Sequence, residues 1–246
     1  MSIRANDRRS GSLIWFFLVS LLLLLTAFLL HYAFERWFAA PAAKPAALSE
    51  PRTVLLDAGH GGQDGGAVSV TGTPEKELNL SVTLISADLL RSLGYRVILT
   101  REKDVELRAD GGGSRKMQDL KGRLLLAEAN PGAPFLSFHM NKFPQGKYHG
   151  LQVYYARRDP ASRPLAEAIQ SAVKQVLQPD NERAVKPATS AIFLLDNITS
   201  PAVLIECGFL SNEAEAKRLE DPVYQTELAL TVVSAFAAWD AARPDA

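Results

Sequence analysis

The chain has 246 residues, of which 47% are hydrophobic and 22% charged, as in an ordinary folded protein. Its 27 lysines and arginines balance its 27 aspartates and glutamates, so the basic excess of a nucleic-acid-binding domain is absent and no nucleic-acid partner is expected. The single cysteine, Cys207, excludes an intrachain disulfide, so the core or a metal ion must hold the fold together.

The N-terminal segment predicts attachment to a membrane. Residues 13–34 form an apolar run whose one ionisable residue is His31, and about 20 apolar residues suffice to cross a bilayer. Three arginines lie within residues 1–12, so the positive-inside rule places that stretch in the cytoplasm and the rest of the chain outside. A cleaved secretion signal is the alternative, but its apolar region is usually only about 7–15 residues long. We expect a transmembrane signal anchor at 13–34 and an Ala/Pro-rich linker over 35–51.

From residue 52 onward, strand-like runs alternate with helical patterns. The expected strands are 53–59, 95–100, 135–140, 151–156, 191–195 and 202–208, and the expected helices are 77–93, 114–130, 163–177, 213–219 and 222–240. This alternation predicts an α/β fold, a three-layer sandwich with a mostly parallel twisted central sheet flanked by helices. A single domain over 52–242 is long enough to bury its own core.

The first expected strand runs into "VLLDAGHGGQDGGAVSV", where glycines surround His60. Glycine allows positive φ and close approach to the main chain. The glycine-rich motifs that bind phosphate do not occur here. The functional interpretation that remains is that the turn positions His60 at the end of the strand to bind a ligand. A loop histidine held only by hydrogen bonds is the alternative if His60 has no partners.

Ligands of open α/β sheets bind at the carboxyl ends of the strands. Three such ends carry polar side chains, His60, His139 with Asn141, and Glu206. Catalytic zinc typically takes three His or Glu ligands and keeps one position for water. His60 and His139 supply two, and the helix that follows the glycines offers Glu75 for the third.

Two further alternatives concern glutamates. Glu77 is a second candidate ligand, but interaction with the helix dipole explains it, so Glu75 is preferred. Glu206 follows four apolar residues, a setting that raises the pKa of a carboxyl and suits a general base; a strand-end carboxylate paired with lysine or arginine is the structural alternative. We also expect Asp64 to orient the glycine turn and Asn141 to hold substrate or order the site.

The motifs "LLDAGHGGQDGGA", "EKELNL", "TRE", "SFHMN" and "VLIECGFLSN" occur in this order. In them the chain from about Arg52 to its end resembles the zinc-dependent N-acetylmuramoyl-L-alanine amidases of the type 3 family. The resemblance implies zinc ligands at the two histidines and Glu75, settling the choice against Glu77, and a catalytic Glu206. It also implies cleavage of the amide between the lactyl group of muramic acid and L-alanine of the peptidoglycan stem peptide.

Finer features are similar to those of the germination-specific amidases of endospore formers. The roughly 40 residues between Thr100 and His139 leave no room for the blocking helix of family members that are kept inactive until division. This similarity implies action on spore-cortex peptidoglycan in the forespore, where removal of the peptide leads to muramic δ-lactam. It also implies a functional partner, either a deacetylase that completes the δ-lactam or an activator protein. The alternatives are a general cell-wall amidase of growth or division, a zinc peptidase acting within the stem peptide, and a membrane-tethered muropeptide-binding module without activity.

The chain departs from the family pattern at three positions, Ala58, Met140 and Cys207, none of which is a proposed ligand. We expect Cys207 to be a small buried thiol behind the site, because a zinc hydrolase needs no cysteine nucleophile.

Overall fold

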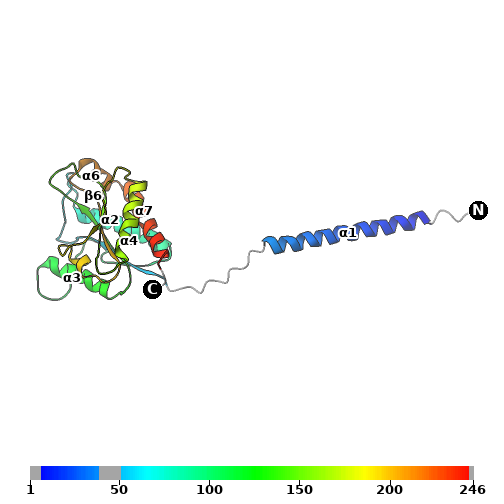
Figure 1. Ribbon diagram of the computed structural model, residues 1–246, viewed down its shortest axis with the longest axis horizontal. Helices are drawn as coiled ribbons and strands as arrows, with labels where there is room; N and C mark the ends of the chain where they lie inside the picture. Colours follow the sequence, from blue (N-terminus) through cyan, green and yellow to red (C-terminus); the bar gives the residue numbers. More distant parts are fainter. Residues whose placement is uncertain (1–6, 39–50, 244–246) are drawn as a thin grey trace, which may run out of the picture. The chain divides into compact units, whose positions relative to one another are not determined.

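The structure is a computed structural model that describes residues 7–38 and 51–243. The chain divides into two units, residues 1–50 and 51–246, shown in Figure 1. The first contains α1 (Asp7–Phe38). Among the described residues, α1 holds the one segment long and apolar enough to cross a membrane, Trp15–Tyr32, although a signal sequence meets the same criteria. Residues 39–50 of the expected linker and residues 1–6 lie outside the described part of the chain.

The second unit is built on a six-stranded sheet with the order β2-β1-β3-β6-β4-β5. The strands are β1 (Thr53–Ala58), β2 (Arg96–Leu99), β3 (Phe135–Asn141), β4 (Gln152–Tyr155), β5 (Lys186–Pro187) and β6 (Ala202–Phe209). All neighbouring pairs are parallel except β4 and β6, which are antiparallel. The mostly parallel sheet expected from the sequence is therefore confirmed.

Helices cover both faces of this sheet (Figure 1). They are α2 (Glu75–Ser92), α3 (Arg115–Glu128), α4 (Ser162–Val176), α5 (Phe193–Asn197), α6 (Glu213–Glu220) and α7 (Pro222–Ala241). Helix α7 packs against α2 and α4, and α3 packs against α5. Two hydrophobic clusters fill the space on the two sides of the sheet. Because both faces are covered, β6 is apolar and buried along almost its whole length.

The structure corrects three details of the expected elements. Residues 191–195 are not a strand, because Phe193–Asn197 form the short helix α5; an apolar run of this length does not distinguish the two states. The two-residue strand β5 was not expected. Helix α2 begins at Glu75 rather than Glu77, directly after the extended Pro74.

The register of the sheet brings the expected strand ends together. His139 of β3 pairs with Glu206 of β6, and Ala58, the last residue of β1, pairs with Phe138. Directly paired residues project to the same face of a sheet, so His139 and Glu206 share a face. Their neighbour Cys207 lies in the core on the other face and is fully buried, as expected.

Candidate metal and catalytic site

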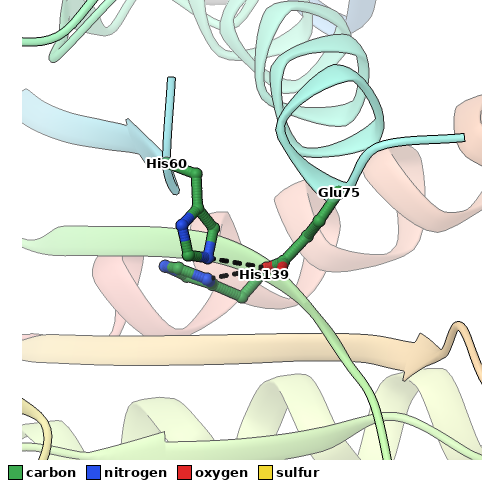
Figure 2. A group of neighbouring side chains, drawn as sticks. All are labelled: His60, Glu75 and His139. Atoms are coloured by element: carbon green, nitrogen blue, oxygen red, sulfur yellow. Dashed lines mark hydrogen bonds and ion pairs between the residues drawn. The ribbon is translucent and has the colours of Figure 1, made fainter. Parts of the chain in front are cut away.

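His60, Glu75 and His139 converge at the carboxyl edge of the sheet (Figure 2). The Nε2 atom of His60 lies 3.2 Å from Oε1 of Glu75, and Nδ1 of His139 lies 3.0 Å from the same oxygen. The two imidazole rings meet edge to face with centroids 5.0 Å apart. The structure thus brings together the three residues that the sequence singled out, one from the loop after β1, one from α2 and one from β3.

The donor set and its spacing fit a zinc ion. Two imidazoles and one carboxylate are a ligand set of catalytic zinc, with bonds of about 2.0–2.1 Å to nitrogen, which separates tetrahedral ligand atoms by about 3.3 Å. One ligand atom from each residue lies within 4.8 Å of the others. The candidate ligand Glu77 is instead exposed on the first turn of α2.

His60 is held in an unusual backbone conformation. Its φ is 61°, and it is the one non-glycine residue with positive φ in the described part of the chain, a strain that tends to occur at functional sites. Its Nδ1 atom lies 2.9 Å from Oδ2 of Asp64. Burial lowers the pKa of His60, but contacts with Glu75 and Asp64 outweigh it and leave that pKa raised. Asp64 also accepts a hydrogen bond from the Gly66 amide (3.1 Å), so it contacts both the His60 ring and the glycine turn, and its role in orienting them stays a prediction.

Two of the glycines are required because the main chain touches the converging side chains. A Cβ atom at Gly59 would lie 2.2 Å from the His139 ring. At Gly66, where φ is 67°, a Cβ atom would lie 2.5 Å from Oε2 of Glu75 and 2.8 Å from the His60 ring. Close packing around the site therefore requires glycine at these two positions.

Glu75 is fixed in place by main-chain donors on two sides. Its Oε1 accepts a hydrogen bond from the Met140 amide (3.1 Å) and its Oε2 one from the Ala67 amide (2.9 Å), while Asn79 Nδ2 lies 3.3 Å from Oε1. Burial raises the pKa of Glu75, but the hydrogen bonds with His139 and His60 dominate and lower it strongly. The carboxylate is therefore held in its ionised form, with Oε1 facing the two imidazole rings.

Glu206 has a different environment on the same face. Burial raises the pKa of this carboxyl to about 7, with His139 acting against the shift and Glu75 adding to it. Its Oε2 is buried and has no hydrogen-bond partner among the described residues, and no lysine or arginine of that part of the chain pairs with it. The paired-carboxylate alternative is therefore wrong, and a carboxyl that exchanges a proton near neutral pH lies beside the three converging side chains.

Asn141 ends β3 after an irregularity in its pairing with β6. Its main-chain oxygen accepts a hydrogen bond from Leu210 (2.8 Å). Within the described residues, its side chain makes no hydrogen bond to His60, His139 or Glu206. A role for Asn141 in holding substrate stays a prediction.

Sequence reasoning missed a buried ionic network beneath the glycine turn. Arg123 of α3 forms an ion pair with Asp57, which is fully buried in β1, and another with Asp119 at 2.8 Å. The same guanidinium donates to the carbonyl oxygens of Ala58 (2.8 Å) and His60 (2.7 Å). An aspartate inside an apolar strand was the available signal, because such a carboxylate needs a buried cation.

A second arginine supports the same turn. Arg101, from the "TRE" motif, donates to the carbonyls of Ala58 (2.9 Å) and Gly59 (3.0 Å). Lys76 binds Gly62 O at 2.8 Å and Asp104 at 2.6 Å. The loop after β2 therefore holds the glycine turn through Arg101 directly and through the ion pair of Asp104 with Lys76. Between β2 and β3, α3 is the one helix in the described chain, and it carries Arg123 and Asp119 of the buried ionic network.

Comparison with known proteins gives the context of this site. Residues 54–238 match the model of a family described as N-acetylmuramoyl-L-alanine amidase. The chain is 35% identical over 184 residues to the germination-specific N-acetylmuramoyl-L-alanine amidase of Bacillus subtilis (strain 168), covering 74% of this chain and 76% of that protein.

Solved structures agree with the sequence comparison. The CwlD amidase from Clostridioides difficile, determined in complex with the GerS lipoprotein, superposes with a TM-score of 0.73 at 39% identity, covering 78% of this chain and 100% of that one. An N-acetylmuramoyl-L-alanine amidase from Clostridium difficile 630 superposes with a TM-score of 0.70 at 28% identity, covering 80% and 100%.

Proposed function

Because the chain belongs to the N-acetylmuramoyl-L-alanine amidase family, we propose that it uses zinc, held by His60, Glu75 and His139, to hydrolyse peptidoglycan of the spore cortex. The enzyme is an amidase of the bond between N-acetylmuramic acid and L-alanine. The observation that carries the zinc proposal is the convergence of two imidazole nitrogens on one carboxylate oxygen at 3.0 and 3.2 Å.

Held by His60, Glu75 and His139, zinc would act as a Lewis acid that makes water nucleophilic near neutral pH. The residues of the chain supply the rest. Asp64 orients the His60 ring through Nδ1, and the main-chain amides of Ala67 and Met140 orient Glu75. These contacts hold the donor atoms in place before the substrate arrives, which reduces the reorganisation needed during reaction.

Glu206 serves as general base and then as general acid. Its carboxylate takes a proton from the water that attacks the lactyl carbonyl carbon. As the C–N bond breaks, the same carboxyl gives that proton to the L-alanine nitrogen, which leaves as an amine. The raised pKa of Glu206, about 7, suits both steps near neutral pH.

The cortex assignment is supported by similarity to the germination-specific amidase of B. subtilis. The CwlD neighbour was determined with a lipoprotein, so we propose that this enzyme also has a lipoprotein partner. The comparisons offer that class of partner and not the deacetylase expected from the sequence. A general wall amidase would instead cleave vegetative and cortex peptidoglycan equally.

The proposed organisation follows the sequence expectations. Residues 1–12 lie in the cytoplasm and residues 13–34 anchor the chain in the membrane. Residues 35–51 link this anchor to the zinc amidase domain over 52–242, which acts outside the cytoplasmic membrane. The apolar segment Trp15–Tyr32 supports the anchor. If the segment is cleaved as a signal, the domain is secreted.

The test uses the full chain in detergent, stripped of metal and then supplied with zinc. Cortex and vegetative peptidoglycan are digested, and new L-alanine N-termini are measured by mass spectrometry. We expect products that disappear with chelator, return with zinc and form faster from cortex. Activity that survives complete metal removal would refute the zinc proposal, cleavage elsewhere in the stem peptide would indicate a peptidase, and a folded, zinc-loaded protein without product would favour the binding module.

A further inference from the structure

Arg183 is a cation held in place without an acidic partner. Its Nε donates to the carbonyl oxygen of His149 (2.7 Å), and its NH1 to Oε1 of Gln152 (3.2 Å). Within residues 51–243, no aspartate or glutamate forms an ion pair with it. Arg123, by contrast, is neutralised by two aspartates.

The guanidinium of Arg183 also lies over an aromatic surface. Its Cζ is 4.4 Å from the ring centroid of Phe209, which is buried, and 6.0 Å from that of Tyr148. Arginine stacked on aromatic rings keeps its planar fork oriented and is well suited to bind a carboxylate through two hydrogen bonds. A half-buried guanidinium with two neutral acceptors and no counter-ion can bind an anion without first breaking an ion pair.

Strand register places this cation close to the catalytic carboxyl. Gln152 of β4 pairs directly with Glu206 of β6, and neighbouring strands lie about 4.8 Å apart. The two side chains share one face of the sheet. Since Arg183 contacts the side chain of Gln152, its guanidinium lies within roughly 10 Å of Glu206, on the side away from His139.

Tyr154 lies on the same face, two residues beyond Gln152. Burial and the Glu206 carboxylate raise the pKa of Tyr154, and Arg183 lowers it. Its phenol is therefore within electrostatic reach of both groups. The Tyr154 hydroxyl makes no hydrogen bond to another described residue, so it is free to donate to a ligand.

We propose that Arg183 and the Tyr154 hydroxyl form a subsite that binds a carboxylate of the stem peptide. This inference rests on the amidase function of the chain. In the substrate, the lactyl carboxyl is already part of the scissile amide and the N-acetylated sugar is neutral, so the anionic groups near that bond belong to the peptide. An extended peptide advances about 3.3 Å per residue, so the subsite is within reach of the first three residues after the scissile bond.

The test measures binding of a product peptide, which needs no turnover. The full chain in detergent, loaded with zinc, is titrated calorimetrically with L-alanyl-γ-D-glutamyl-diaminopimelate. It is also titrated with the same peptide in which the free α-carboxylate of D-glutamate and the side-chain carboxylate of diaminopimelate are carboxamides. We expect the wild type to bind the acidic peptide at least about tenfold more tightly, as a charge-assisted pair predicts. Equal affinity of the wild type for both peptides would overturn the proposal without any mutation.

Variants then assign the selectivity to the subsite. Arg183→Gln should abolish the preference for the acidic peptide while leaving affinity for the amidated one unchanged. Equal weakening of both peptides would indicate a structural role and overturn the proposal. Arg183→Lys should keep part of the preference, and Tyr154→Phe should reduce it a few-fold. Arg163→Gln, which removes an exposed arginine of α4, is the matched control and should change nothing.

Two readouts keep the proposal separate from the zinc function. If Arg183→Gln does not fold, the wild-type comparison and Tyr154→Phe still decide, since that hydroxyl supports no other described residue. Peptidoglycan hydrolysis is assayed in parallel on the same wild-type sample. Selective peptide binding without hydrolysis would count against the proposed zinc chemistry and support the subsite, whereas hydrolysis without selectivity would do the reverse.

Discussion

The Nδ1 atom of His60 lies 2.9 Å from Oδ2 of Asp64, while Nε2 of the same ring faces Glu75 at 3.2 Å. The carboxylate therefore determines which ring nitrogen is available at the centre of the site. Carboxylates of this kind fix the tautomer and raise the basicity of a histidine ligand. Asp64 lies four positions after His60 in the sequence, and the glycine turn folds one back onto the other.

Substitution of Asp64 should weaken zinc binding without unfolding the domain. We expect Asp64→Ala to lower zinc affinity by about 10- to 100-fold, measured by competition with a chromophoric chelator. Asp110→Ala, in the exposed loop before α3, is the control and should bind zinc as the wild type does. Unaltered affinity in Asp64→Ala would mean that His60 does not depend on this carboxylate.

The glycine turn offers a matched pair of variants. A Cβ at Gly59 would lie 2.2 Å from the His139 ring, whereas one at Gly65 would meet nothing within 4 Å. Gly59→Ala should displace His139, lower zinc affinity at least about tenfold and abolish most activity, because ligand geometry must hold within about 0.5 Å. Gly65→Ala should keep both properties. Equal behaviour of the two variants in the chelator competition would contradict this packing argument.

Glu206→Gln tests the general base. The amide cannot accept the proton of the attacking water, so hydrolysis of peptidoglycan should fall by about 10²- to 10⁴-fold. Zinc content, measured by atomic absorption, should be unchanged, since Glu206 is not one of the three converging residues. Glu128→Gln, an exposed glutamate at the end of α3, should retain full activity. A Glu206→Gln enzyme working at the wild-type rate would remove the proposed role.

Breaking the buried ion pair of Asp57 and Arg123 should destabilise the domain strongly. Asp57→Asn removes the fully buried partner of Arg123 and leaves only the pair with Asp119, and breaking a buried pair in this way costs about 3–5 kcal/mol of the free energy of unfolding. Glu167→Gln breaks an exposed pair with Arg163 and should cost less than about 1 kcal/mol. Denaturant unfolding followed by circular dichroism measures both, and similar costs would contradict the assigned burial effect.

The same pair predicts a pH dependence. Burial raises the pKa of Asp57, but Arg123 and the Ser137 hydroxyl outweigh it and leave that pKa below its ordinary value. The stabilisation is therefore complete above the unfolded pKa of about 3.9 and is lost as pH falls toward the lower folded pKa. The stability difference between wild type and Asp57→Asn should be constant from about pH 7 to 5 and should narrow below about pH 4. If this stability difference narrowed as the pH was raised, the pKa of Asp57 would not be lowered by folding.

Much of the site could be predicted because its chemistry lies in short motifs. The glycines, the strand-end histidines and Glu206 are recognisable from residue type and position, and parallel strands bring such ends to one edge. The short apolar run at 191–195 was misassigned for a related reason: five residues contain too little periodicity to separate a strand from a helix.

The sequence by itself determined the α/β class, the apolar N-terminal segment and the set of residues that could carry the chemistry, because periodicity and local composition report on neighbours along the chain. Only the tertiary structure decided that Asp64 binds His60, that Arg123 lies beneath the glycine turn, and that Arg183 binds the side chain of Gln152, the residue paired with Glu206. The last relationship depends on β4 running antiparallel to β6, and strand order and register arise from packing between distant segments, which no local pattern encodes.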